Sequence, residues 1–236
     1  AGDKLTVTVF DLNTFNLIGS RLYVYEGTNW TLQHQFDGET ILYIDDTKAY
    51  TQAPGPGAYP YLINERSYDG GQWNLVRTSE FSHSASAISG DGSTLVWSYQ
   101  DFTYAWFTDM YRRINDEWVY TNQIQGSFFS KRGISDNGRI LIDAPGYNTL
   151  RVYDYPWATP LLEFVGSEFT TKAISPDGTL LATMNNLYSL PSGSLITALA
   201  GYQNQPNSGP VISKDNKTII KYVIAYDLQV LNYPFT

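Results

Sequence analysis

The chain has 236 residues, a formal net charge of −8 at pH 7, no cysteine and 15% aromatic residues. The acidic balance disfavours binding to nucleic acid or to an anionic membrane, and the lack of cysteine excludes disulfides and thiolate chemistry. No apolar stretch approaches the roughly 18 residues of a membrane span. No segment has the period of an amphipathic helix, so we expect an all-β protein.

The first elements along the chain are a strand at Leu5–Phe10 and a hairpin formed by Arg21–Tyr25 and Trp30–Leu32. Because only one strand precedes the hairpin, the first structural unit is expected to lack a strand. A phrase at Phe36–Leu42 follows, in which Asp37 and Gly38 are typical turn residues between two apolar runs. We expect it to form an inner hairpin of the second unit.

An eleven-residue phrase then recurs four times without a gap. Each copy has an apolar run, a turn with Asp or Asn followed by Gly or Asn, and a second apolar run, which predicts two antiparallel strands. Two consecutive apolar residues after the turn indicate that both faces of the second strand are covered. The copies are Ile88–Ser98, Ile134–Ala144, Ile174–Met184 and Ile212–Tyr222.

A second phrase, a tyrosine within an apolar run followed by a turn and another apolar run, occurs six times. Its tyrosines are about 40 residues apart on average, which is the period of four-stranded propeller blades. We predict a single β-propeller domain with six four-stranded blades, while five or seven blades, or a β-sandwich, remain alternatives. The tyrosines are Tyr25, Tyr61, Tyr111, Tyr153, Tyr188 and Tyr226, and the predicted blades are approximately 1–36, 37–81, 82–126, 127–166, 167–201 and 202–236.

The segments Gly19–Phe36 and Ile88–Ile124 resemble the FG-GAP-type repeat of extracellular propellers. The Ile-Ser-x-Asp-Gly half-phrase is also similar to WD40-like propellers. The resemblance implies a fold better than an activity, since propellers serve unrelated functions. It also has departures: turns such as Ser89–Ser93 offer few side-chain oxygens, whereas calcium takes about six to eight oxygen ligands. We therefore expect no metal and no cofactor. The Gly-His and Trp-Asp pairs of WD40 blades are missing as well.

Motifs for catalysis are sparse. The two histidines are His34, in a predicted edge strand, and His83, in a predicted loop, and neither lies in a known catalytic motif. A pair of carboxylates at the mouth of a central channel could still catalyse the hydrolysis of a glycoside. The candidates for that alternative are Asp45, Asp46, Asp101 and Asp109. We expect the chain not to be an enzyme.

Two long connections are predicted next to each other in the propeller, Asp45–Pro60 and Ser98–Asp109. Long connections in a compact domain are often functional, and aromatic residues beside carboxylates or amides suit sugar stacking or a protein contact. The alternative is that the rings only cover blade edges. The predicted binding surface consists of Tyr50, Tyr59, Tyr99, Asp101, Phe102, Tyr104 and Trp106.

The repeats account for a whole propeller, and the sequence has no recognisable catalytic motif. This combination favours a non-catalytic function. We expect a propeller that binds a protein partner, a neighbouring copy or a glycan, and that is extracellular or on a particle surface. Binding of nucleic acid and insertion into a membrane are not expected. Two alternatives remain, which are the glycosidase-like enzyme and an intracellular WD40-like adaptor.

Overall fold

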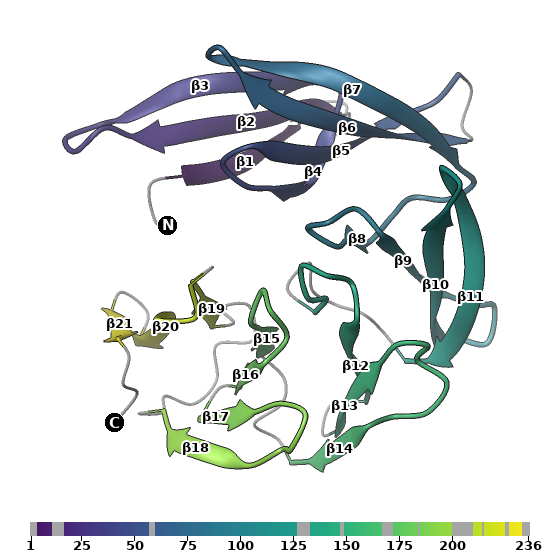
Figure 1. Ribbon diagram of the computed structural model, residues 1–236, viewed down its shortest axis with the longest axis vertical. Helices are drawn as coiled ribbons and strands as arrows, with labels where there is room; N and C mark the ends of the chain where they lie inside the picture. The colour runs from purple at the N-terminus through teal and green to yellow at the C-terminus, as the bar shows by residue number, and fades with distance from the viewer. Residues whose placement is uncertain are drawn as a thin grey trace. The chain divides into compact units, whose positions relative to one another are not determined.

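Every regular element is a β-strand in the part of the chain that the computed structural model describes. The strands form six antiparallel sheets (Figure 1). None of the described residues belongs to a helix that could cross a membrane. The chain divides into two compact units, which are Ala1–Ala85 with Ile114–Trp118, and Ser86–Arg113 with Val119–Thr236. The described residues are 4–10, 17–56, 60–126, 133–146, 149–166, 172–183, 185–199, 210–213, 215–224 and 227–232.

The first unit contains two sheets, in which each strand pairs with its neighbour in sequence. Among the described residues, one sheet has three strands and the other has four. Their strands are β1 (Lys4–Phe10), β2 (Leu17–Tyr25) and β3 (Trp30–Asp37), then β4 (Thr40–Ile44), β5 (Lys48–Pro54), β6 (Tyr61–Asp69) and β7 (Gln72–Phe81).

The second unit contains the other four sheets, except for the tip of the β10–β11 hairpin, which belongs to the first unit. Their strands are β8 (Ala87–Ile88), β9 (Thr94–Gln100), β10 (Trp106–Ile114), β11 (Glu117–Gln125); β12 (Ile140–Gly146), β13 (Thr149–Asp154), β14 (Leu162–Val165); β15 (Lys172–Ile174), β16 (Leu180–Thr183), β17 (Asn186–Ser189), β18 (Leu195–Ala198); β19 (Val211–Ile212), β20 (Thr218–Ile224) and β21 (Asp227–Asn232).

The four copies of the repeated phrase form the inner hairpins, as predicted. In each copy the first isoleucine lies opposite the apolar residue seven positions later, and all eight side chains are buried. Removing these side chains from water is a main source of stability in such sheets. The opposed pairs are Ile88 with Leu95, Ile134 with Leu141, Ile174 with Leu181, and Ile212 with Ile219.

The four turns share one hydrogen-bond pattern, which explains the repeated Ser-x-Asp/Asn. In the first copy Ser89 Oγ donates to Asp91 Oδ1 (2.6 Å) and accepts the Thr94 N–H (3.0 Å). Asp91 Oδ1 also accepts the Ser93 N–H (2.9 Å). The turn is thus closed by its own side chains. The corresponding serine-to-Asp/Asn bonds are Ser135–Asn137 (2.7 Å), Ser175–Asp177 (2.7 Å) and Ser213–Asp215 (2.6 Å).

Neighbouring turns of the second unit also bind one another. The Asp91 N–H donates to the Asp136 carbonyl (2.7 Å), and the Asp136 N–H donates to the Pro176 carbonyl (2.6 Å). Thr94 Oγ1 donates to the Gly138 carbonyl (3.1 Å), so successive sheets are joined at their turns. The repeat is therefore a unit of packing between sheets as well as a hairpin.

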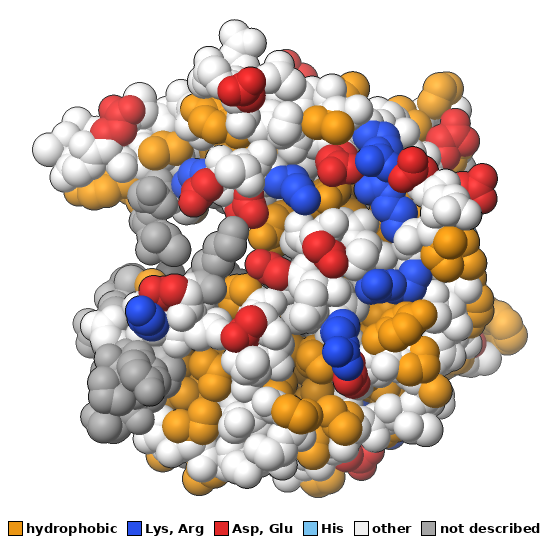
Figure 2. Space-filling view, viewed as in Figure 1, with side chains coloured by type: hydrophobic (Ala, Val, Ile, Leu, Met, Phe, Trp, Pro, Cys, Tyr) orange, Lys and Arg blue, Asp and Glu red, His pale blue; other side chains and the backbone are white. Residues whose placement is uncertain are grey.

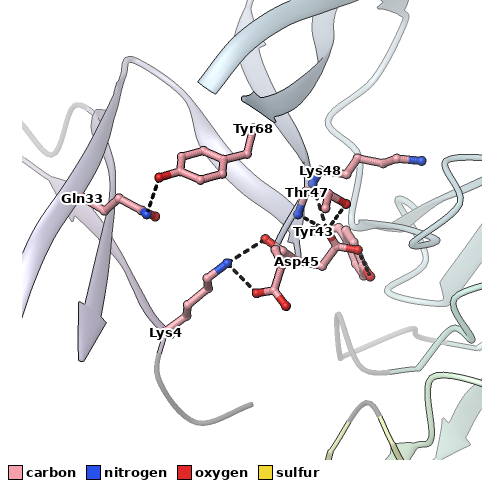
Figure 3. Close-up of polar contacts among 8 residues, drawn as sticks. Lys4, Gln33, Tyr43, Asp45, Thr47, Lys48 and Tyr68 are labelled. Carbon is pink, nitrogen blue, oxygen red and sulfur yellow. Dashed lines mark hydrogen bonds and ion pairs between the residues drawn. The ribbon is translucent and has the colours of Figure 1, made fainter. Parts of the chain in front are cut away.

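The prediction of an inner hairpin at Phe36–Leu42 is wrong. Asp37 ends β3, and the chain crosses to the second sheet there. The inner hairpin of that sheet turns at Asp45, whose Oδ1 accepts the N–H groups of Thr47 and Lys48 (both 2.8 Å; Figure 3). Lys4 Nζ donates to the Asp45 carbonyl (3.1 Å; Figure 3) and thereby joins β1 to this turn.

A buried ion pair joins the two sheets of the first unit. Glu39 follows β3 and accepts hydrogen bonds from Arg66 Nη2 (2.6 Å), Asn64 Nδ2 (3.0 Å) and the Thr51 hydroxyl. Its carbonyl accepts the Ser20 hydroxyl (2.9 Å) from β2. The carboxylate therefore has several donors, as a charge withdrawn from water requires.

Candidate functional site

The candidate site lies on the β9–β10 hairpin of the second unit. Phe107 pairs with Tyr99, and Asp109 pairs with Trp97. Because side chains alternate along a strand, these four residues and Tyr111 share one face of the sheet. The opposite face carries Val96 and Met110, which belong to the buried core shared with β12 and β13.

The loop between β9 and β10 is short and closed by hydrogen bonds. Asp101 Oδ1 accepts the Thr103 N–H (2.8 Å), the Thr103 hydroxyl (2.7 Å) and the Ala105 N–H (3.0 Å). The Asp101 N–H donates to the Ala105 carbonyl (2.9 Å). The hydroxyl of Thr103, with the two backbone N–H groups, lowers the pKa of the Asp101 carboxyl. The loop therefore has a defined shape held by one carboxylate.

This loop holds two aromatic rings in solvent. Phe102 is 94% exposed and Tyr104 is 82% exposed. Tyr104 has a φ of 64°, a left-handed conformation that is uncommon for a residue with a side chain. The alternative in which the loop aromatics only cover blade edges is wrong for these two rings, because they bury almost none of their surface.

Five of the seven predicted surface residues come together on this hairpin, and two do not. Tyr50 lies in β5, is 1% exposed and packs near Tyr43, so its predicted exposure is wrong. Tyr59 lies outside the described residues. The five residues that lie on the hairpin are Tyr99, Asp101, Phe102, Tyr104 and Trp106.

The predicted lengths of both loops are too large. The segment Asp45–Pro60 contains the strand β5, and the segment Ser98–Asp109 is mostly strand, which leaves only Asp101–Ala105 as the loop. The polar residues within these segments made them resemble loops. In β5 they are buried and hydrogen-bonded: Gln52 Oε1, for example, accepts the Ala85 N–H (2.5 Å).

Asp109 is the central charged group of the hairpin face. It is 7% exposed, and its Oδ1 accepts Gln123 Nε2 from β11 (2.8 Å). The same amide donates to the Tyr99 hydroxyl (3.0 Å). Gln123 and Tyr120 are functional candidates that the sequence did not indicate, because the register of β11 against β10 cannot be obtained from the repeat.

The charge of Asp109 acts on three tyrosines. Burial, and then the negative charge of Asp109, raises the pKa of Tyr99, Tyr111 and Tyr120. For Tyr111 the pKa rises to about 12. The three phenols therefore stay protonated at neutral pH, and they can donate as well as accept hydrogen bonds.

Of the residues considered for catalysis, Asp109 lies on this face and Asp101 closes the adjoining loop, while the others belong to the first unit. His34 is in β3, where burial and the charge of Arg66 lower its pKa. His83 Nδ1 hydrogen-bonds with the adjacent Ser82 hydroxyl (2.7 Å). Asp46 forms an ion pair with Lys4 (2.7 Å). Across the described ranges, no group of three or more His, Cys, Asp or Glu is placed to hold a metal ion.

A buried lysine forms a second unusual charge in the second unit. Lys172 on β15 is 7% exposed, and burial lowers its pKa from 10.5 to about 8, while the charge of Asp143 on β12 opposes this shift. Asp143 is also fully buried, and its carboxylate lies against Gly126, where an added Cβ would approach the carboxyl carbon to 2.6 Å. The two charges are thus held in the core of this unit.

The free energy of unfolding should rise between pH 8 and pH 10 because of Lys172. In this range the unfolded state binds the lysine proton and the folded state has released it, so folding becomes more favourable as the pH increases. A shift of roughly 2.5 pKa units at about 1.36 kcal/mol each gives about 3.4 kcal/mol in full, and about 2 kcal/mol of it is gained between pH 8 and pH 10. Urea unfolding of the wild type and of Lys172→Met at several pH values measures this gain. If the free energy of unfolding changes with pH equally in the two proteins, the prediction is contradicted.

On the face shown in Figure 2, acidic and basic side chains are interspersed, and hydrophobic side chains reach the surface in several places. Exposed hydrophobic side chains occur on outer strands too, for example Leu195 and Ile196 on β18. Such scattered residues are normal, and the hairpin loop differs from them in the extent of its exposure.

No protein-family model matches this chain, and no curated protein matches it either. Solved structures do match, each over 98% of this chain. TolB from Acinetobacter baumannii is 13% identical with a TM-score of 0.57, and this chain covers 62% of it, which is less than two thirds. A chain of the mitotic checkpoint complex is 12% identical (TM-score 0.57, 70% covered). A putative 6-phosphogluconolactonase from Bacteroides uniformis is 12% identical (TM-score 0.56, 80% covered).

These three structures are β-propellers, and the likeness confirms the predicted fold class. Identities this low show the fold alone. They do not assign the chain to the FG-GAP-type or the WD40 repeats that its sequence resembles. Since propellers support many unrelated activities, the function has to be argued from the site.

Proposed function

We propose that this chain is a non-catalytic β-propeller that binds a protein partner through the β9–β10 hairpin, in an extracellular or particle-surface setting. The contact surface, which we call the hairpin surface, consists of Tyr99, Asp101, Phe102, Tyr104 and Trp106. The observation that carries the proposal is the hydrogen-bonded Asp101–Ala105 loop, which holds Phe102 and Tyr104 almost fully in solvent.

Exposed rings on a preorganised loop are well suited to binding. Burying a large apolar side chain contributes about 1.5–3 kcal/mol, and aromatic side chains often dominate the energetics of protein interfaces. The hydrogen bonds to Asp101 already fix the loop, so binding needs little further ordering of the backbone. Little of the free energy gained by burying these rings is therefore lost in ordering the loop.

A protein partner fits this surface better than a glycan does. Phe102 has no polar group, and it projects from a loop tip, so it matches a pocket on a partner more closely than the flat ring of a sugar. Sugar recognition relies on aromatic rings combined with polar groups that bind hydroxyls. Asp101 Oδ1 already accepts three hydrogen bonds within the loop, so only the other carboxylate oxygen is left to bind a hydroxyl. A glycan remains an outcome that the test below can reveal.

The proposal is tested with the double substitution Phe102→Ala and Tyr104→Ala. Because both rings are exposed, the melting temperature should stay nearly unchanged, as is usual for surface substitutions. The amount of partner captured by the immobilised chain, from cell extract and culture medium, should fall at least tenfold. Mass spectrometry identifies the captured protein or glycan.

The matched control replaces two exposed hydrophobic residues elsewhere in the second unit, Leu195→Ala and Ile196→Ala on β18. This control should capture as much partner as the wild type. Equal losses for the two double variants would contradict a specific hairpin surface. A loss of partner together with a fall of many degrees in melting temperature would show that Phe102 and Tyr104 support the fold instead.

A further inference from the structure

The Asp109 carboxylate is an unusual group for the middle of a sheet face. It is nine-tenths buried, and Gln123 supplies its hydrogen bond to Oδ1. Among the described residues it forms no ion pair, and no donor reaches Oδ2. A buried carboxylate without a cation is costly, because its charge has lost most of its contact with water. Oδ2 therefore remains able to accept a strong donor.

The rings around Asp109 form a surface suited to a flat cation. Trp97 stacks on Tyr99 with ring centroids 4.2 Å apart and an interplanar angle of 20°. Tyr99 lies 5.8 Å from Phe107 at 28°. At the other side Tyr111 and Tyr120 meet edge to face at 5.8 Å. Aromatic faces attract cations, and nearly parallel rings favour the planar guanidinium of arginine, which also stacks.

Two arginines follow Asp109 on β10, and the first of them, Arg112, is turned to the other face. The Arg112 guanidinium lies over the Tyr155 ring (5.0 Å) and donates to Ser93 Oγ (3.0 Å). Arg112 follows Tyr111 in sequence and so points to the opposite face of β10. The charges that raise the pKa of Tyr99 come from Asp109, Asp101 and another tyrosine. Arg113 follows Tyr111 on the Asp109 face, but the charges that act on Tyr111 and Tyr120 are those of Asp109 and other tyrosines, so the surroundings of these rings are electronegative.

We infer that Asp109 and the aromatic residues beside it receive an arginine side chain of the partner protein. Asp109 Oδ2 accepts the guanidinium N–H groups, the rings of Tyr99 and Phe107 contact its flat face, and Tyr120 borders the open side, where it is 53% exposed. The inference rests on the proposed function, since Tyr99 belongs to the hairpin surface. The net charge of −8 also favours a basic partner.

The test uses N-acetylargininamide as the probe and N-acetylcitrullinamide as a neutral control of nearly equal shape. The fluorescence of the intact chain, or the NMR signals of its tyrosine rings, should report saturable binding of the arginine probe with a Kd on the order of 1 mM. The citrulline probe should bind at least tenfold more weakly. Equal binding of the two probes, or no binding of the arginine probe, would overturn the inference.

Two substitutions locate the site. Asp109→Asn keeps the shape of the side chain but removes its charge, and it should weaken the arginine probe at least tenfold. Tyr120→Leu affects an exposed ring, and it should weaken the probe several-fold even if Asp109→Asn fails to fold. The control Asp154→Asn, which removes a surface carboxylate paired with Arg139, should change nothing. Undiminished binding by a folded Asp109→Asn variant would overturn the inference, and so would undiminished binding by Tyr120→Leu.

Further outcomes separate this inference from the proposed function. Tighter binding of tetramethylammonium than of the arginine probe would overturn the assignment in favour of a small quaternary ammonium ligand. If the arginine probe does not bind but Phe102→Ala with Tyr104→Ala still loses the partner, only the arginine site is overturned. If the probe binds at Asp109 and the double variant keeps its partner, the cation site stands and the proposed function is overturned.

Discussion

Replacing Glu39 with alanine should lower the free energy of unfolding by about 3–5 kcal/mol, the usual cost of removing one partner from a buried ion pair. The side chain of Arg66 is only 17% exposed, so its guanidinium would keep its charge after losing the carboxylate. Asn64 and Thr51 would lose an acceptor at the same time. Urea unfolding followed by tryptophan fluorescence measures the loss.

The matched control is Glu163→Ala, which removes another glutamate paired with an arginine. Arg151 and Glu163 form an ion pair of 3.0 Å on the surface, with side chains 31% and 46% exposed. Exposed pairs contribute at most about 1 kcal/mol, so this variant should remain close to the wild type. Glu39→Gln should lie between the two, because it removes the charge but keeps hydrogen-bonding atoms. Similar losses for Glu39→Ala and Glu163→Ala would show that the Glu39 pair is not buried as described.

Replacing Gly138 with alanine should cost about 3 kcal/mol or more. Gly138 has a φ of 64°, and alanine in that conformation costs roughly 1–2 kcal/mol. The added Cβ would also overlap the Thr94 hydroxyl and lie 2.8 Å from Thr94 Cβ. Thr94 is fully buried and donates to the Gly138 carbonyl, so it cannot move away easily. Overpacking of this kind typically costs about 1–3 kcal/mol more.

Gly38→Ala separates the cost of the backbone conformation from the cost of overpacking. Gly38 has nearly the same φ, 66°, but no atom lies within 4 Å of the position of an added Cβ. It should therefore show the backbone cost alone, about 1–2 kcal/mol. The difference between the two variants measures the crowding between neighbouring turns. If both lose the same free energy, the turns of successive sheets are not packed as tightly as the hydrogen bonds between them indicate.

The sequence predicted the parts of the fold that follow a repeated local pattern. The Ser-x-Asp/Asn turns are closed by hydrogen bonds of their own side chains, so the same short motif forms the same hairpin in all four copies. The turn at Asp45 uses the same kind of bond but has no glycine or asparagine after it, and it was missed. The strand that follows was missed too, because Thr51 and Gln52 are polar but buried through hydrogen bonds to Glu39 and Ala85.

The candidate site was predicted in part for a similar reason. An aromatic-rich segment between two strands is visible in the sequence, and Phe102, Tyr104 and Trp106 were named from it. The pairing of β9 with β10 shortens the loop and turns Tyr99, Phe107 and Asp109 onto one face. The contact of Gln123 with Asp109 depends on a third strand. Such a contact follows from register, which composition and spacing do not determine.

The most direct test of the hairpin surface is the capture of partner by the Phe102→Ala/Tyr104→Ala variant, measured beside its melting curve and the Leu195→Ala/Ile196→Ala control. We expect the hairpin variant to melt like the wild type and to recover less than a tenth of the partner, while the control recovers all of it. Full recovery by a normally folded hairpin variant would contradict the account, because the two most exposed rings of the loop would then contribute nothing to binding.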